Sequence, residues 1–185
     1  MSKKSIDRKA VAGIIQSGRL EGRSDTEIYT RLSAEYFDRK KIAQLITGTV
    51  TEQRKKNHRD AQITLLVLLG ISVVFSLLTV ISMALNSLGI YLMFFVLFLP
   101  MINIIFLVQI MLYKASAYRG CAILVMLGVV QGFKNWSTME SWTIFTNLAF
   151  AGAIVGLCFY LDNKLFPNYS PNNMKPDSNG DYRVE

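Results

Sequence analysis

Charge is scarce in this chain, and it is almost missing from the middle. Charged residues make up 18% of the 185 residues, against about 25% in a typical soluble domain. Between Gln62 and Leu161 the charged side chains all lie in or beside expected connections: Lys114, Arg119, Lys134 and Glu140. Because burying a charge in hydrocarbon is costly, this segregation predicts a membrane-spanning block flanked by polar segments.

The motifs of common active sites are also missing. The sequence contains no metal-binding cluster, phosphate-binding loop, dinucleotide-binding fingerprint or nucleophile elbow. The expected spans hold no acidic residue and no histidine, whereas intramembrane proteases and proton-coupled transporters generally need ionisable groups at that depth. We therefore predict that the protein is not an enzyme and that it binds no cofactor or metal.

Cysteine is nearly missing too. The two cysteines, Cys121 and Cys158, both lie in apolar stretches and give neither a disulfide framework nor metal-ligand spacing. We expect two small buried residues, with palmitoylation near the inner membrane surface as the alternative. No secretory signal peptide is visible, since the first long apolar run follows a highly charged segment, and we expect that run to be a retained anchor.

What is present at the start is a basic, helix-forming head, residues 1–60. It carries 14 basic and 8 acidic residues and predicts a cytoplasmic module of three helices. A core this small supplies little stability, so we expect the head to depend on the membrane, a neighbouring subunit or a partner. The residues expected in that core lie at helical spacing: Val11, Ile14, Ile15, Ile28, Tyr29, Leu32, Ile42, Ala43, Leu45 and Ile46.

Capping signals place the three helices of the head. The first is expected over residues 6–17, with Gly18 at its C-terminal end. Ser24 and Glu27 have the spacing of a capping box, which starts the second helix. Asp38 is the expected N-cap of the third helix. Phe37, just before it, is expected to pack against the first turn.

Two basic clusters are the candidate sites for lipid or a partner. They are Arg39, Lys40 and Lys41 at the start of the third helix, and Arg54, Lys55, Lys56 and Arg59 before the first span. The second cluster favours a cytoplasmic location and can hold anionic lipid. The first cluster, after a capped helix, also suggests a helix-turn-helix that contacts phosphates, although the eight acidic residues of the head favour a solvated helix start.

Apolar runs within residues 61–162 predict an all-α membrane domain with four transmembrane helices. The expected spans are residues 63–85, 88–113, 117–136 and 142–161, each about as long as a ~30 Å hydrocarbon core requires. Pro100 is expected to kink the second span. The apolar part of the third, residues 121–133, is short, so it is either re-entrant or extended with Arg119 and Lys134 reaching toward water.

Polar and small residues inside the spans are the remaining candidates. Gly128/Gly132 and Gly152/Gly156 form two GxxxG pairs, which favour close helix packing within the chain or between protomers. The intramembrane polar residues are Asn103, Gln109, Gln131 and Asn147. For Asn103 we favour a packing contact over a residue that lines a pathway.

Loop charges predict the orientation. Lys and Arg concentrate in the head and in the connection that follows the second span, which places both termini in the cytoplasm of a cell or inner membrane. The tail, residues 163–185, is rich in Pro, Asn, Asp and Ser and is expected to be disordered.

These observations lead to three hypotheses of function. The first is an integral membrane adaptor or regulatory protein whose cytoplasmic head binds a protein partner, with membrane lipid around its spans. The second is a homo-oligomeric pore or membrane-perturbing effector, suggested by the glycine pairs and the intramembrane polar residues. The third is a membrane-tethered sensor of nucleic acid or nucleotide that uses Arg39, Lys40 and Lys41, which the acidic residues of the head disfavour.

Overall fold

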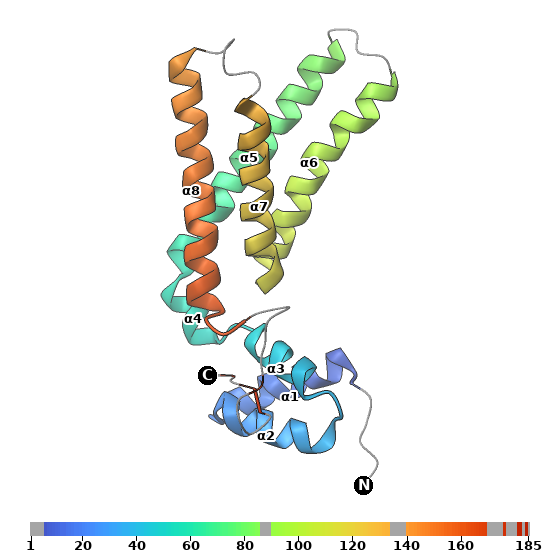
Figure 1. The fold of residues 1–185 in the computed structure, drawn as a ribbon, viewed down its shortest axis with the longest axis vertical. Coiled ribbons are helices and arrows are strands. Elements are labelled where there is room, and N and C mark those ends of the chain that lie inside the picture. Colours follow the sequence, from blue (N-terminus) through green and yellow to red (C-terminus); the bar gives the residue numbers. More distant parts are fainter. Residues whose placement is uncertain are drawn as a thin grey trace. The chain divides into compact units, whose positions relative to one another are not determined.

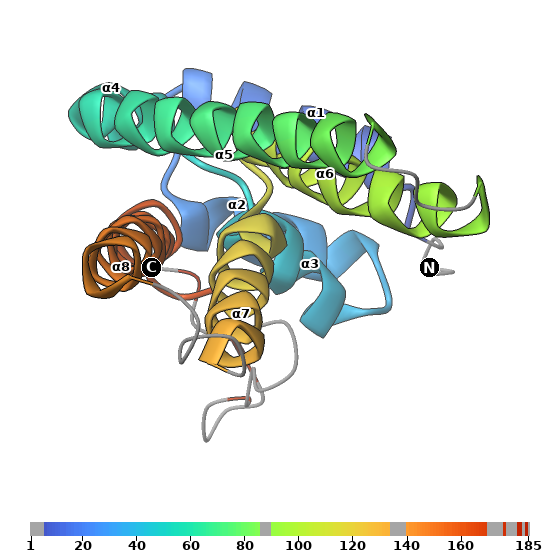
Figure 2. The same ribbon diagram turned by 90° about the horizontal axis from the view of Figure 1, so that it is seen from above.

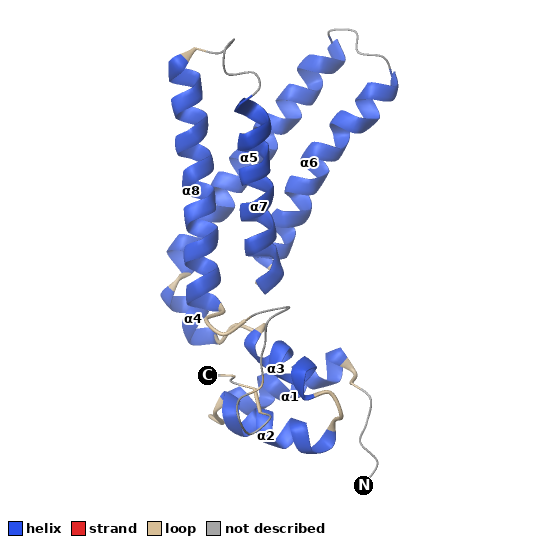
Figure 3. Cartoon of the chain, in the orientation of Figure 1, coloured by secondary structure: helices blue, strands red, loops and turns tan. Residues whose placement is uncertain are grey.

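The computed structural model describes residues 6–85, 90–133, 140–169, 176, 181, 182 and 184, with backbone alone for 83–85 and 90–99. It is all-helical, with eight α-helices and no strand among those residues (Figure 3). The chain divides into two compact units, each taken by itself below. The head unit is Met1–Lys56 with Lys164–Glu185, and the membrane unit is Asn57–Asn163.

Three helices build the core of the head unit. They are α1 (Arg8–Leu20), α2 (Asp25–Glu35) and α3 (Arg39–Thr47), seen in blue tones in Figure 1. The expected core residues are buried, except that Ile14 and Leu45 are partly buried at its margin. Helical periodicity was sufficient to predict these core residues because each helix buries one continuous apolar stripe.

The predicted N-caps of α2 and α3 are confirmed. Ser24 Oγ accepts the Glu27 backbone N–H, and Glu27 Oε2 accepts the Ser24 N–H, so both bonds of the capping box are present. Asp38 Oδ1 accepts the Lys41 backbone N–H at 3.0 Å. Each bond pairs a donor that the first helical turn leaves unsatisfied.

The prediction that Gly18 ends the first helix is wrong. The helix continues to Leu20, and Gly18 is buried against α2. A Cβ at Gly18 would lie only 3.0 Å from Ile28 Cδ1, so glycine permits the close approach of α1 and α2. The turn is made instead at Gly22, whose φ of +78° favours glycine.

The expected packing of Phe37 is also wrong. Its side chain is 81% exposed, while the preceding Tyr36 is 7% exposed and belongs to the core. Tyr36 has extended backbone geometry after α2, which directs successive side chains to opposite sides. Only one of two adjacent aromatics can then point inward.

A contact that the sequence did not reveal joins all three head helices. Arg19 in α1 donates from Nε and Nη2 to the Asp25 carboxylate at 2.7 and 2.8 Å. The same guanidinium donates to the backbone oxygens of Ile46 and Thr49 at 3.0 and 3.1 Å. It thus pairs carbonyls at the C-terminal end of α3, where helical partners run out.

The longest helices belong to the membrane unit. After the short α4 (Glu52–Asn57) come α5 (Arg59–Leu85), α6 (Ile90–Met111), α7 (Ala115–Gly132) and α8 (Ser141–Leu165). Figures 1 and 2 show α5 and α6 side by side along their length. The α6–α7 connection is only three residues and includes Tyr113 at a φ of +52°.

The structure supports three membrane-crossing helices by length and composition, rather than the predicted four. Among the described residues, the qualifying segments are Arg59–Ser82, Ala115–Gly132 and Ser141–Leu165. In α6 the apolar stretch with described side chains is Pro100–Met111, which alone is shorter than the ~20 residues that a bilayer requires.

For the third apolar run, the structure agrees with the longer of the two alternatives. Helix α7 is continuous from Ala115, six residues before Cys121, and reaches spanning length. Arg119 lies inside this helix and pairs with Asp162, an acidic side chain of α8. Residues 121–133 are therefore only part of a longer helix.

Candidate functional site

The head surface holds a short segment from the C-terminal end of the chain. Val184 is 7% exposed and lies in the head core, and Tyr182 packs against that core. The Tyr182 backbone N–H donates to the Tyr29 hydroxyl at 3.4 Å, and Arg39 Nη1 lies 3.2 Å from Asp181 Oδ1. The structure differs from the predicted disordered tail at these three residues, which we call the tail contact.

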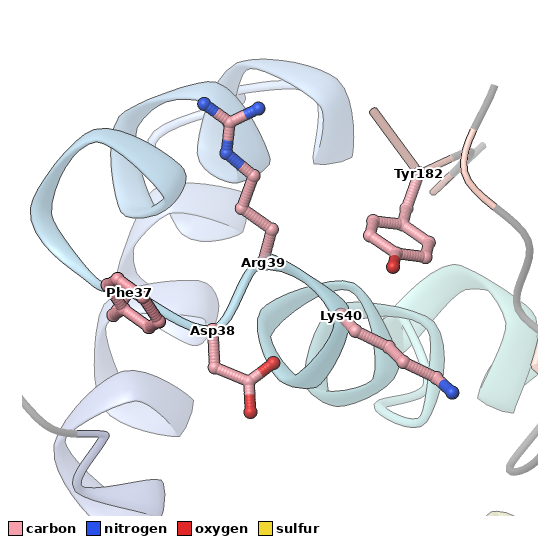
Figure 4. A pocket seen from close by; sticks show the side chains of 5 residues that line it. All are labelled: Phe37, Asp38, Arg39, Lys40 and Tyr182. Atoms are coloured by element: carbon pink, nitrogen blue, oxygen red, sulfur yellow. The ribbon is translucent and has the colours of Figure 1, made fainter. Parts of the chain in front are cut away.

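An open depression borders the tail contact. It has a volume of about 380 Å³ and is lined by Phe37, Asp38, Arg39, Lys40 and Tyr182. Figure 4 shows Phe37 and Tyr182 at its two sides, with the other three residues between them. Exposed aromatic surface beside basic side chains is typical of protein-binding surfaces.

The three residues of the first predicted basic cluster differ in their exposure to solvent. Arg39 and Lys40 are exposed and line the depression, whereas Lys41 is half-buried and its backbone N–H is held by Asp38. Arg39 and Asp181 have side-chain exposures of 46% and 57%, so water screens their attraction. Arg39 therefore positions the tail more than it stabilises the fold.

Burial raises the pKa of Tyr29 above its ordinary value, and the backbone hydrogen bond from Tyr182 opposes part of that shift. The hydroxyl consequently stays neutral at physiological pH. A neutral hydroxyl can accept the Tyr182 N–H and still donate elsewhere. The Tyr29 hydroxyl is thus the hydrogen-bond acceptor of the tail contact.

The second basic cluster lies on α4 and at the start of α5. Arg54 and Lys55 are half-buried, while Lys56 and Arg59 are exposed. Lys55 Nζ bonds Glu52 Oε1 at 2.7 Å, and this hydrogen bond lowers the pKa of the Glu52 carboxyl. The sequence did not indicate that these residues form a separate short helix.

A buried polar junction in the membrane unit was missed. Gln62 Nε2 donates to the Ile110 carbonyl at 2.8 Å, and the Tyr118 hydroxyl donates to Gln62 Oε1 at 2.7 Å. All three residues are at most 3% exposed. The junction joins α5, α6 and α7 at one end, and its satisfied polar groups make it a structural link.

An ion pair between a partly exposed arginine and a buried carboxylate joins α7 to α8. Arg119 Nε bonds Asp162 Oδ2 at 2.6 Å, and the Asp162 side chain is 3% exposed. Its other oxygen, Oδ1, has no hydrogen-bond partner among the described residues. The sequence placed Asp162 at the last position of the predicted membrane domain, just beyond the fourth expected span. Its position four residues after Cys158 in an apolar helix was the signal that it faces inward.

The other predicted intramembrane residues do not come together. Asn103 Nδ2 donates to Ser76 Oγ at 3.1 Å, the packing contact that we favoured. Gln109 is half-buried, while Gln131 and Asn147 are exposed on their helices. A Cβ on Gly128, Gly152 or Gly156 would meet nothing within 4 Å. Within one chain, these three glycines therefore do not mediate close helix packing.

The two cysteines do meet. Cys121 in α7 and Cys158 in α8 are buried with their thiols hydrogen-bonded to each other, and the expectation of burial is confirmed. Over the described part of the chain, no group of three or more His, Cys, Asp or Glu side chains could hold a metal ion. No family model, no curated protein and no solved structure matches this chain.

Proposed function

We propose that the protein is an integral membrane adaptor whose cytoplasmic head binds a partner protein. The carrying observation is the tail contact, because it shows a head surface that accommodates a short segment through apolar, polar and ionic contacts at once. The apolar helices of the membrane unit supply the anchor. The basic α4 region supports a cytoplasmic location of the head.

The proposal includes four crossings, with α6 as the additional one, and both termini in the cytoplasm of the cell or inner membrane. Its support is the distribution of Lys and Arg along the sequence and the pairing of α6 with α5. The length of α6, 22 residues, is compatible with a crossing.

Capture of the partner tests the adaptor proposal. The full chain is crosslinked in its native membrane, extracted mildly and compared with K40E, a change in the depression. R31E, an exposed change on α2, is the matched control. We expect K40E to reduce the captured partner by about tenfold, the effect of losing ~1.4 kcal/mol, and R31E to leave it unchanged. Equal capture by all three proteins, or no captured protein, would overturn the proposal.

An oligomeric pore or membrane-perturbing effector is the second candidate. It is supported by Gly128, Gly152 and Gly156, which have open space around them, and by the exposed Gln131 and Asn147. Such surfaces favour contacts between protomers in a membrane. The mass after mild extraction and the conductance of reconstituted bilayers test it, and a non-conducting monomer would eliminate it.

A nucleic-acid or nucleotide sensor has less support. Arg39 is paired with Asp181 and Lys41 is half-buried, which reduces the basic surface that could contact phosphates. Binding that strengthens steeply as salt is lowered would be its signature.

A further inference from the structure

The tail contact has the geometry of a bound peptide. Asp181 reaches outward to Arg39, Tyr182 lies on the head with its backbone N–H on Tyr29, and Val184 is buried in the core. Tyr182 and Val184, two positions apart in sequence, both pack with the head core. Recognition of extended segments commonly combines backbone hydrogen bonds with pockets for alternate side chains.

Each contact selects one chemical property of the segment. The Arg39 guanidinium favours an acidic residue, since a carboxylate is the side chain that complements it. The margin of the core beside Tyr29 accommodates an aromatic ring, and the buried position of Val184 accommodates an aliphatic side chain. The head surface therefore selects an acidic residue at position 181, an aromatic residue at 182 and an aliphatic residue at 184.

The contacts are of the kind that a competing segment can replace. The Arg39–Asp181 pair is exposed on both sides, and exposed pairs contribute little. The hydrogen bond between Tyr182 and Tyr29 is long at 3.4 Å. Val184 alone among the three residues of the tail contact is buried, so most of the affinity depends on one aliphatic side chain.

We infer that Asp181, Tyr182 and Val184 form an internal ligand that occupies the partner-binding surface of the head. The partner docks through an extended segment of the same chemistry and displaces the tail. This inference rests on the proposed adaptor function. The tail thereby lowers the apparent affinity of the head for the partner, because only the fraction of molecules with a released tail can bind it.

A synthetic peptide of residues 176–185 tests the inference on the full chain in lipid nanodiscs. The V184D chain, whose tail would be released, is expected to bind the peptide about tenfold more tightly than the unchanged chain, the scale of removing a central apolar contact. P176A changes an exposed tail residue and is expected to match the unchanged chain. A peptide that itself carries V184D is expected to lose binding.

A charge exchange checks the register. In the V184D chain, whose tail is already released, adding R39E should weaken peptide binding by about threefold, as for an exposed pair, and a peptide with Asp181→Arg should restore it. If the peptide fails to bind the V184D chain, or binds both chains equally well, the inference is overturned.

A second measurement does not depend on the folding of any variant. Excess unlabelled peptide is added to the unchanged, nitrogen-15-labelled chain, and the Tyr182 amide resonance is followed. We expect it to move to the position of an unbound segment, and a resonance that stays fixed at saturating peptide contradicts displacement. Partner capture without peptide binding would overturn this inference alone. Peptide binding without any captured partner would overturn the adaptor function instead.

Discussion

At the scale of single residues, long polar side chains determine which helices meet. Arg19 pairs with Asp25 in α2 and with carbonyls at and beyond the end of α3. Both partners of the ion pair are largely buried, with 15% and 14% of their side chains exposed. Removing one partner of a buried pair leaves the other charge uncompensated, which costs more than the pair contributes.

R19A should therefore destabilise the head by about 3 kcal/mol. Native-state hydrogen exchange of core amides such as that of Leu32, in the full chain, measures the loss. R23A is the matched control, because Arg23 pairs with Glu21 on the surface, and it should cost less than about 1 kcal/mol. Equal losses for the two variants would contradict the central position of Arg19.

Tyr29 gives the head a pH dependence of known sign. Its pKa is raised in the folded state, mainly by burial, from the ordinary value of 10.0. The unfolded chain then releases the phenolic proton first as the pH rises. The stability that Tyr29 contributes is complete below pH ~10 and is lost as the pH rises toward the folded pKa.

Y29F should remove this part of the alkaline loss of head stability between pH ~9 and ~11. Y36F, which leaves Tyr29 intact, should retain it. Hydrogen exchange referenced to a pH-matched unfolded peptide measures both slopes. A Y29F slope equal to that of the unchanged chain would show that other groups carry the dependence.

At the scale of elements, α8 is the helix whose placement depends most on side chains. It reaches the other membrane helices through the Arg119–Asp162 pair, the Cys121–Cys158 contact and Tyr160, whose hydroxyl lies 3.4 Å from His58 Nδ1. The α5–α6 pair, by contrast, packs along its length. Polar links of this kind specify one register of a helix that apolar packing alone leaves free to slide.

Crosslinking tests this register of α7 and α8. Iodine should join Cys121 and Cys158 within one chain, since two thiols give up two protons and two electrons to form a disulfide and two iodide ions. Mass spectrometry of the unreduced peptides should find this pair, and C121S should abolish it. Disulfides exclusively between chains would mean that α8 packs differently.

At the scale of the whole molecule, the side of the tail depends on how many helices cross. Four crossings place the C-terminus on the same side as the head, and three place it on the opposite side. The tail contact requires the same side, because residues 181–184 and the head are in one unit. A topology with three membrane crossings would contradict the tail contact.

Topology reporters decide between these counts. Fusions after Ser116 and Asp177 should read cytoplasmic, and fusions after Asn86 and Ser137 should read external. The reason is the group of basic residues at 54–59, because Lys and Arg beside a span favour the cytoplasmic side. A cytoplasmic reading after Ser116 together with an external reading after Asp177 would mean that α7 and α8 do not both cross, and the tail contact would fail with it.

Residue spacings were sufficient to predict the features that depend on neighbours in sequence. The capping box at Ser24, the cap at Asp38 and the buried stripes of α1, α2 and α3 follow from spacings of three and four residues. The apolar runs likewise predicted the membrane helices of the first and last spans. Gly18, Phe37 and the ends of α7 were predicted wrongly because each depends on what packs against it.

The sequence by itself determined the helical class, the separation of a charged head from an apolar block, and the residues of the head core. These follow from local spacing and from the cost of burying charge, both of which act along the chain. Tertiary structure alone decided that Arg19 joins three helices, that Asp162 is paired inside the membrane unit, and that the C-terminal residues lie on Tyr29 and Arg39. Such contacts join residues up to 153 positions apart, and no local pattern records which distant surfaces will meet.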